Sequence, residues 1–306
     1  MNTTANPSPN RLTLFLALAS VYILWGSTYL FIHFMTERMP PLYMASLRLT
    51  TAGALLYLYA RLTGSPVPTR KDWLSAGSIG ILLLTIANGG MTIAVQHIPT
   101  GVAALMAATL PLFIMLLNWL TFARVRPSGL SMAGLLLGLV GVSMLVRPGG
   151  AQAASGNLWI GVGIIMVGNL SWALGTLLSG RLSLPSQLIS SAIQMLVGGA
   201  TLFIISQLTE NVSLLDISHA PPKAIGSLIY LVIFGSIIGF SSFAWLARNA
   251  SPSLVSTYAY VNPVVAMLLG WAFAGETLTT QSVLAALVIL SGVVLITLGK
   301  SERAKE

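Results

Sequence analysis

Long apolar runs alternate with short polar breaks along the whole chain. Most of these runs are close to the roughly 20 residues that a helix needs to cross the hydrocarbon core of a bilayer. Dividing the chain at Pro, Gly and charged positions predicts ten membrane-spanning helices. The longest break, residues 209–223, is too short to add a folded domain. The expected spans are residues 12–34, 42–62, 73–95, 101–122, 130–146, 158–178, 188–208, 224–246, 254–274 and 283–299.

Composition supports a membrane protein and excludes several other classes. Hydrophobic residues make up 55% of the 306 and charged residues 7%, whereas soluble domains carry roughly a quarter charged residues. The net charge of +8 does not indicate nucleic-acid binding, because the basic residues lie between apolar runs and not on a soluble module. Cysteine is absent and the three histidines are scattered, so we expect no disulfide, metal site or cofactor.

Lys and Arg are unevenly divided between the two sides of the predicted bundle, which predicts its orientation. Eleven basic residues fall on the side of both termini and three on the other, while Arg48 lies inside the second span. We therefore expect both termini in the cytoplasm and the 210–223 loop in the periplasm. The larger set is Arg11, Arg61, Arg70, Lys71, Arg124, Arg126, Arg181, Arg248, Lys300, Arg303 and Lys305, and the smaller is Arg38, Arg147 and Lys223.

The two halves of the chain carry similar patches in the same order. MLLNW follows Pro111 as MLLGW follows Pro263, and LRLTTAGA aligns with IQMLVGGA, which pairs Arg48 with Gln194. The aromatic set Tyr22, Trp25 and Tyr29 has its counterpart in Asn169, Trp172 and Thr176. These patches predict a duplicated five-span unit, residues 1–152 and 153–306. Five spans are an odd number, so the second copy would have inverted topology, an architecture common among secondary transporters.

Four segments carry a resemblance to a known family: YILWGSTYLFI from Tyr22, ASLRLTTAGALL from Ala45, ALMAATLPLF from Ala104 and STYAYVNPVVAMLLGWAFAGETLT from Ser256. With them the whole chain resembles the EamA family of the drug/metabolite transporter (DMT) superfamily, and most closely its YedA-like members. The resemblance implies ten helices in two inverted repeats and transport of small metabolites, often outward. One departure lies at the end of the fourth span, where Arg124 stands in place of Glu276.

Arg48 is the most informative polar residue inside a predicted span. Charged groups at membrane depth are costly and usually face a cavity or another helix. Arg48 lies about 9 Å inside the outer end of its helix at 1.5 Å per residue. It can either extend to the interface or face a cavity and bind a carboxylate. We favour the cavity.

Further polar and aromatic residues share helix faces. Thr85, Asn88, Thr92 and Gln96 form a stripe that indicates either an inward polar face or hydrogen bonds between helices. Pro111 and Pro263 are candidate hinges, because proline frees a backbone carbonyl. The complete set of candidate substrate-binding residues is Trp25, Tyr29, Arg48, Asn88, Trp172, Gln194, Tyr258 and Asn262.

The pattern predicts a secondary transporter of a bacterial inner membrane and no enzyme. All seven acids lie in loops, span ends or tails, which favours facilitated diffusion, exchange or weak coupling over tight proton antiport. One cation with aromatic and amide neighbours suits a small molecule that carries a carboxylate, such as an amino acid, and we expect its export. The alternative is efflux of drugs or other toxic compounds, and a channel or an intramembrane enzyme fits less well. The expected partners are this substrate and the lipid bilayer, without nucleic acid, and the oligomeric state stays open.

Overall fold

The computed structural model describes residues 11–122, 127–146, 158–210, 212, 220–250 and 257–303. Within these residues the secondary structure is helical, and no strand forms. The expected all-α class is therefore confirmed. The expected boundary between the repeats, at residues 152 and 153, lies outside the described residues, as do Arg124, residues 254–256 and most of the 210–223 loop.

Several helical segments of the first half join α-helical and π-helical parts. The first segment consists of α1 (Arg11–Ser20), η1 (Val21–Trp25) and α2 (Gly26–Thr36), and the second is α3 (Pro41–Leu62). The third consists of α4 (Arg70–Gly80), η2 (Ile81–Asn88) and α5 (Gly89–Ala94). The fourth consists of α6 (Thr100–Ala107), α7 (Leu110–Leu117) and η3 (Asn118–Phe122), and the fifth is α8 (Gly129–Val146).

The second half begins with α9 and repeats the mixture of helix types. Its segments are α9 (Leu158–Ser179); α10 (Gln187–Thr209); α11 (Pro222–Tyr230), η5 (Leu231–Ile238) and α12 (Gly239–Asn249); α14 (Tyr258–Phe273); and α15 (Thr280–Arg303). Helices α3 and α11 each begin with a proline. Proline suits this position because N–H groups in the first turn have no acceptor within the helix, so no helical hydrogen bond is lost.

Six helical segments are long and apolar enough to cross a membrane, by length and composition. They are Arg11–Thr36, Arg70–Ala94, Thr100–Phe122, Leu158–Ser179, Gln187–Thr209 and Pro222–Phe243. Shorter apolar helices cover Gly129–Met144, Val261–Phe273 and Thr280–Ile296. The fold is thus a multi-pass helical bundle, and the count of ten spans and its orientation stay predictions.

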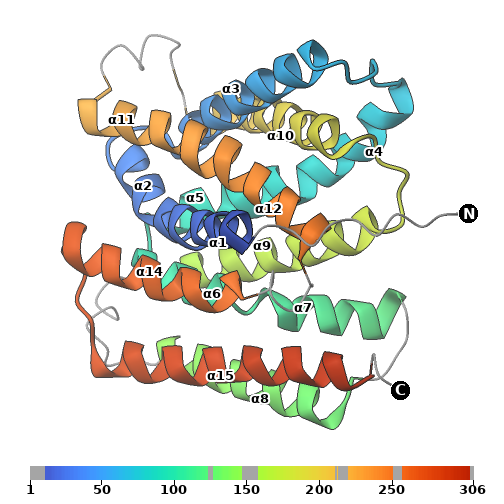
Figure 1. The fold of residues 1–306 in the computed structure, drawn as a ribbon. Coiled ribbons are helices and arrows are strands. Elements are labelled where there is room, and N and C mark those ends of the chain that lie inside the picture. Colours follow the sequence, from blue (N-terminus) through green and yellow to red (C-terminus); the bar gives the residue numbers. More distant parts are fainter. Residues whose placement is uncertain are drawn as a thin grey trace, which may run out of the picture.

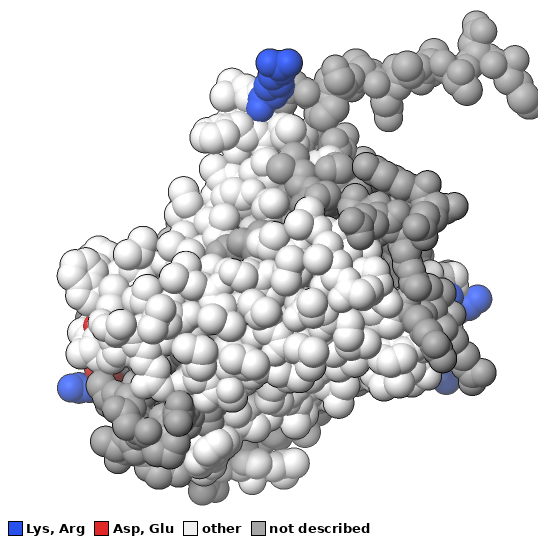
Figure 2. Space-filling model, turned by 90° about the horizontal axis from the view of Figure 1, so that it is seen from below, with Lys and Arg blue, Asp and Glu red and all other residues white. Residues whose placement is uncertain are grey.

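The surface of the bundle is apolar between its two ends. Large side chains away from the helix ends, such as Leu136 of α8 and Leu170 of α9, are 60% and 46% exposed, as expected where lipid and not water covers the protein. Figure 2 shows one such face, which is almost free of charge and has Lys, Arg, Asp and Glu atoms only along its edges. This face suits contact with hydrocarbon.

Glycines allow two helix pairs to pack closely. Helix α3 runs along α10, and α8 runs along α15 as a separate layer (Figure 1). A β-carbon on Gly53 would lie 2.9 Å from the backbone nitrogen of Leu196, and one on Gly292 would lie 2.7 Å from the carbonyl oxygen of Gly134. Small residues at such contacts are typical of membrane helices, whose association depends on close van der Waals packing.

We predict that Gly292→Ala destabilises the bundle, because the added methyl group would overlap the backbone of α8. Overpacking of this kind costs about 1–3 kcal/mol, so the unfolding temperature of the detergent-solubilised protein should fall. Gly163→Ala in α9 is the control, since its β-carbon would meet nothing within 4 Å. An equal unfolding temperature for Gly292→Ala and wild type would contradict the tight packing of α8 against α15.

Candidate functional site

A cavity of about 850 Å³ lies at the centre of the bundle. Its lining comes from both halves of the chain: the helical segments that contain α2, α3, η2 and α7, and those that contain α9, α10, η5 and α14. Helices α8 and α15 contribute no lining residue. We call this space the central cavity.

Arg48 is the cation of the central cavity. It is 6% exposed, and its Nε donates a hydrogen bond to Ser236 Oγ on η5 at 3.1 Å. No carboxylate lies within ion-pair distance of Arg48 among the described residues, and no hydrogen bond of its terminal Nη groups to the described residues is found. A buried cation without a counter-charge is costly in a medium of low dielectric constant. The site therefore has the capacity to bind an anion.

An aromatic cluster forms one wall of the central cavity beside Arg48. The ring centroid of Trp25 lies 5.0 Å from that of Phe243 and 5.4 Å from that of Tyr258, edge to face in the second case. Trp25 Nε1 donates to the carbonyl oxygen of Gly235 at 3.2 Å. A β-carbon on Gly239 would lie 2.6 Å from Trp25 Nε1, so only glycine leaves room for this indole. The wall offers apolar and π contacts to a ligand body.

Two asparagines stabilise the parts of the lining that lie near the prolines. Asn169 Nδ2 donates to the carbonyl oxygen of Met106 at 2.9 Å and to Thr109 Oγ1 at 3.1 Å, at the interruption between α6 and α7 just before Pro111. On α14, the Asn262 amide can be oriented to donate to the carbonyl oxygens of Tyr22 and Tyr258, each at 3.2 Å. These bonds connect the helical segments that line the central cavity.

The central cavity ends within the bundle on the side where α2 ends and α3 and α6 begin. Its lining stops there at Ile32, Met91 and Ala104, which adjoin a buried apolar cluster that contains Met35 and Ala103. Toward the opposite side the lining continues to Thr176. We call the closed side the Glu276 end, after the acidic residue that follows α14.

The comparison with known proteins identifies the family. The EamA-like transporter family matches residues 11–147 and again residues 159–298. The chain belongs to this family. It is 43% identical over 291 residues to the inner membrane transporter YedA of Escherichia coli, with 94% of this chain and 92% of the relative covered.

Two more distant proteins are similar over nearly the whole chain. The EamA-family chain is 26% identical to the transporter YvbV of Bacillus subtilis, over 94% of this chain and 93% of the relative. A solved structure entitled "Crystal structure of protein" superposes with a TM-score of 0.65 at 19% identity, covering 97% of this chain and all of that one, and shares the fold. The expected family and the multi-pass location in a bacterial inner membrane are confirmed.

Most candidate residues from the sequence lie together in this EamA-family protein. The central cavity is lined by Trp25, Tyr29, Arg48, Asn88, Trp172, Tyr258 and Asn262, together with Pro111 and Pro263. Gln194 is not in the lining: its backbone packs against Gly80 of α4, and its Nε2 donates to Ser190 Oγ at 3.0 Å. Substrate binding by the lining residues stays a prediction.

The polar stripe of the third span is divided between two roles. Asn88 lines the central cavity, whereas Thr85 Oγ1 donates to the carbonyl oxygen of Gly198 and Gln96 Nε2 to that of Thr36, each at 3.2 Å. The reason is the π-helical η2 (Ile81–Asn88), since its wider turns change the spacing that aligns residues on one face of an α-helix. Of the two roles expected for this stripe, Thr85 and Gln96 have the second, hydrogen bonding between helices.

Sequence reasoning missed Phe243, Ser236 and Asn169 as parts of the site. Phe243 and Ser236 belong to an apolar stretch in which no spacing separates cavity-facing from lipid-facing positions. Asn169 was noted as the counterpart of Tyr22, and this repeat relation was the signal that pointed to its position.

We predict that the central cavity is wet and the outer face of α9 is not. A cysteine in place of Thr176, in the lining, should react with a small soluble maleimide in open membrane fragments. A cysteine in place of Leu170, which is 46% exposed but outside the lining, should react at least about ten-fold more slowly, because thiolates form poorly in lipid. Equal rates for the two cysteines would exclude this assignment of faces.

Proposed function

We propose that this protein is a secondary transporter that exports small carboxylated metabolites, such as amino acids, across the inner membrane by alternating access. The observation that carries the proposal is Arg48, a cation buried without a carboxylate partner among the described residues and lining the central cavity. A substrate carboxylate would supply the missing counter-charge. A guanidinium can meet both oxygens of a carboxylate with parallel hydrogen bonds.

The remaining lining supports a substrate with an apolar body. The ring of Trp25 packs against those of Phe243 and Tyr258. Its Nε1 bonds to Gly235 of η5, the helix whose Ser236 bonds to Arg48. The volume of about 850 Å³ lies within the usual range for small-molecule sites. A cationic drug would be repelled by Arg48, so multidrug efflux fits this lining less well than transport of a carboxylate.

The glycine contacts support two repeats related by a two-fold axis. Gly53 and Gly199 occupy matching positions in the aligned patches LRLTTAGA and IQMLVGGA. A β-carbon on Gly53 would lie 2.9 Å from the nitrogen of Leu196, and one on Gly199 would lie 2.8 Å from that of Thr50, which matches Leu196. Reciprocal contacts of this kind are what an axis between α3 and α10 requires.

Helix type and family matching support the same arrangement. The π-helices η2 (Ile81–Asn88) and η5 (Leu231–Ile238) each have eight residues, precede Gly89 and Gly239, and fall in the third segment of their halves. The family matches each half separately. Inverted repeats provide alternating access because the two halves can rock about a central site. In this conformation the lining extends toward the side expected to be cytoplasmic, where an exported metabolite would enter.

We predict that both termini are cytoplasmic. With single cysteines introduced into the cysteine-free chain, an impermeant maleimide added to intact cells should label Asp216→Cys in the 210–223 loop and should not label Glu306→Cys. Both should be labelled after the cells are opened. Labelling of Glu306→Cys in intact cells would overturn the orientation.

We predict that Arg48→Gln strongly weakens transport while the protein still accumulates. A hydrogen bond to a charged group contributes about 1.5–3 kcal/mol, so its loss should raise the apparent binding constant roughly ten- to a hundred-fold. Arg48→Lys should recover only part of the affinity, because Lys lacks the planar fork. The measurement is uptake of radiolabelled amino acids and other small carboxylates into inside-out vesicles, normalised to protein abundance.

Arg61→Gln is the matched control for this experiment. Arg61 lies in the last turn of the same helix α3 and outside the lining of the central cavity, so its replacement should leave affinity unchanged. Normal affinity of Arg48→Gln at normal abundance would remove Arg48 from the site. A variant that fails to accumulate but transports normally per folded molecule would assign Arg48 a structural role.

A further inference from the structure

The acidic residues at the Glu276 end connect the two halves of the chain. Glu210 follows α10 and binds the first turn of α3, and Glu276 follows α14 and binds the first turn of α6. Glu37, at the end of α2, pairs with Lys223 of α11 at 3.1 Å. Each of these three described acids therefore joins a residue of one half to a residue of the other.

Glu210 and Glu276 replace helix caps that the sequence does not provide locally. Residues Pro40 and Pro99 stand at the N-caps of α3 and α6 and have no side-chain acceptor for the free N–H groups of the first turn. Glu210 accepts from the N–H of Leu42 at 2.8 Å and from that of Tyr43 at 3.0 Å. A carboxylate at this position also interacts favourably with the positive end of the helix dipole.

Two glycines position Glu276. Gly275 has φ of 69°, which lets the chain turn back directly after α14, and the N–H of Glu276 donates to the carbonyl oxygen of Gly270 at 3.1 Å. The carboxylate then accepts from the N–H of Thr100 at 2.5 Å and from that of Gly101 at 3.2 Å. A β-carbon on Gly270 would lie 2.4 Å from Glu276 Oε2, so only glycine there leaves room for the carboxylate.

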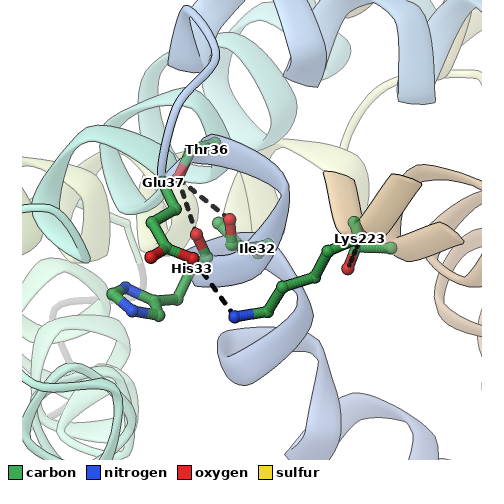
Figure 3. Close-up of polar contacts among 6 residues, drawn as sticks. Ile32, His33, Thr36, Glu37 and Lys223 are labelled. Carbon is green, nitrogen blue, oxygen red and sulfur yellow. Dashed lines mark hydrogen bonds and ion pairs between the residues drawn. The ribbon is translucent and has the colours of Figure 1, made fainter. Parts of the chain in front are cut away.

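The Glu37–Lys223 pair is the weaker connection. Figure 3 shows Lys223 extending from α11 to the Glu37 carboxylate, beside His33. Lys223 holds the pKa of Glu37 below its usual range, so the pair is charged at neutral pH. Its side chains are 51% and 48% exposed, however, and water screens such pairs.

The opposite end of the bundle does not repeat these carboxylates. Asp72, which lies at that end, caps its own helix α4 by a reciprocal pair of bonds with Thr69. The aligned patches match Glu210 to Gly64, which has φ of 86° and no side chain, and Glu276 to Arg124. Carboxylates therefore connect the two halves at the Glu276 end, whereas the Asp72 carboxylate at the opposite end binds Thr69 next to its own helix.

We propose that Glu210 and Glu276 are the gate residues that hold the Glu276 end of the central cavity closed, and that their release from α3 and α6 opens it. The proposal rests on alternating access, the proposed function above. It assigns the two carboxylates a positioning role: they bias the resting carrier toward the conformation that is open on the opposite side. Beneath them, the buried cluster that contains Met35 and Ala103 forms the seal.

The test uses a cysteine in this seal as a reporter. Ala103 is 0% exposed, so Ala103→Cys should be protected from an impermeant maleimide added to the Glu276 end of wild-type vesicles. In Glu276→Gln, its labelling rate should rise roughly ten- to a hundred-fold, the factor for losing a hydrogen bond to a charged group. The rate for Thr176→Cys, measured from the opposite side in a parallel experiment, should fall.

Gly270→Ala provides an independent arm, because it keeps the charge of Glu276 and fills the space of its carboxylate; the added β-carbon would lie 2.4 Å from Glu276 Oε2 and 2.7 Å from Thr100 Oγ1. It should reproduce the effect of Glu276→Gln, and Glu210→Gln should act in the same direction. The controls are Gly226→Ala, whose β-carbon meets nothing within 4 Å, and Asp72→Asn at the opposite end. Both controls should leave the two labelling rates unchanged.

Continued protection of Ala103→Cys in Gly270→Ala and Glu210→Gln, or in Glu276→Gln when this variant folds, would overturn the gate. Faster labelling of both reporters would also overturn it, because that result indicates general loosening. The assay needs no substrate, so its failure is distinguishable from failure of the proposed function. If labelling is unchanged but the vesicles transport carboxylates, only the gate is wrong. If wild-type vesicles transport none of the tested metabolites, the proposed transport of carboxylates is wrong, whatever the labelling shows.

Discussion

A positive charge without a counter-ion inside an apolar bundle is the constraint on which the site depends. Arg48 enters the central cavity from α3, and within the described residues its guanidinium makes one hydrogen bond, to Ser236 of the other half. Replacing water around a charge by hydrocarbon costs free energy, so an anion that enters the central cavity beside Arg48 would stabilise the protein. The same bond connects the two halves at the cavity, so under the proposed function substrate binding at Arg48 would depend on their relative position.

Close backbone packing connects the two halves of the chain at two helix pairs. Glycines bring α3 against α10 and α8 against α15, and contacts of this kind have little side-chain volume to rearrange. Under the proposed alternating access, cross-links between the halves would therefore determine which end opens. At the Glu276 end these links are carboxylates bound to helix N-termini, while Asp72 at the other end serves its own helix.

Apolar run lengths were sufficient to predict an all-helical membrane protein. Repeat matching pointed to Trp25 and Trp172, and charge at membrane depth pointed to Arg48; all three line the central cavity. The differences between expectation and structure have a common physical cause. A repeat relation gives the position of a residue along a helix but not the face it occupies, so Gln194, the counterpart of Arg48, was assigned to the cavity although it packs against α4. The π-helix η2 similarly separated Asn88 from Thr85. Long-range caps such as Glu210 on α3 follow from tertiary contacts that no local pattern reveals.

The central claim, that Arg48 recognises a carboxylate, is tested most directly by pairs of ligands that differ only in charge. Purified wild-type protein and Arg48→Gln would be heated with amino acids and other small carboxylic acids, and with their uncharged amides, while unfolding is recorded. Our account predicts that at least one acid raises the unfolding temperature of wild type, that its amide does not, and that Arg48→Gln loses this preference. Stabilisation by acids that is unchanged in Arg48→Gln, or equal stabilisation of wild type by an acid and its amide, would contradict it.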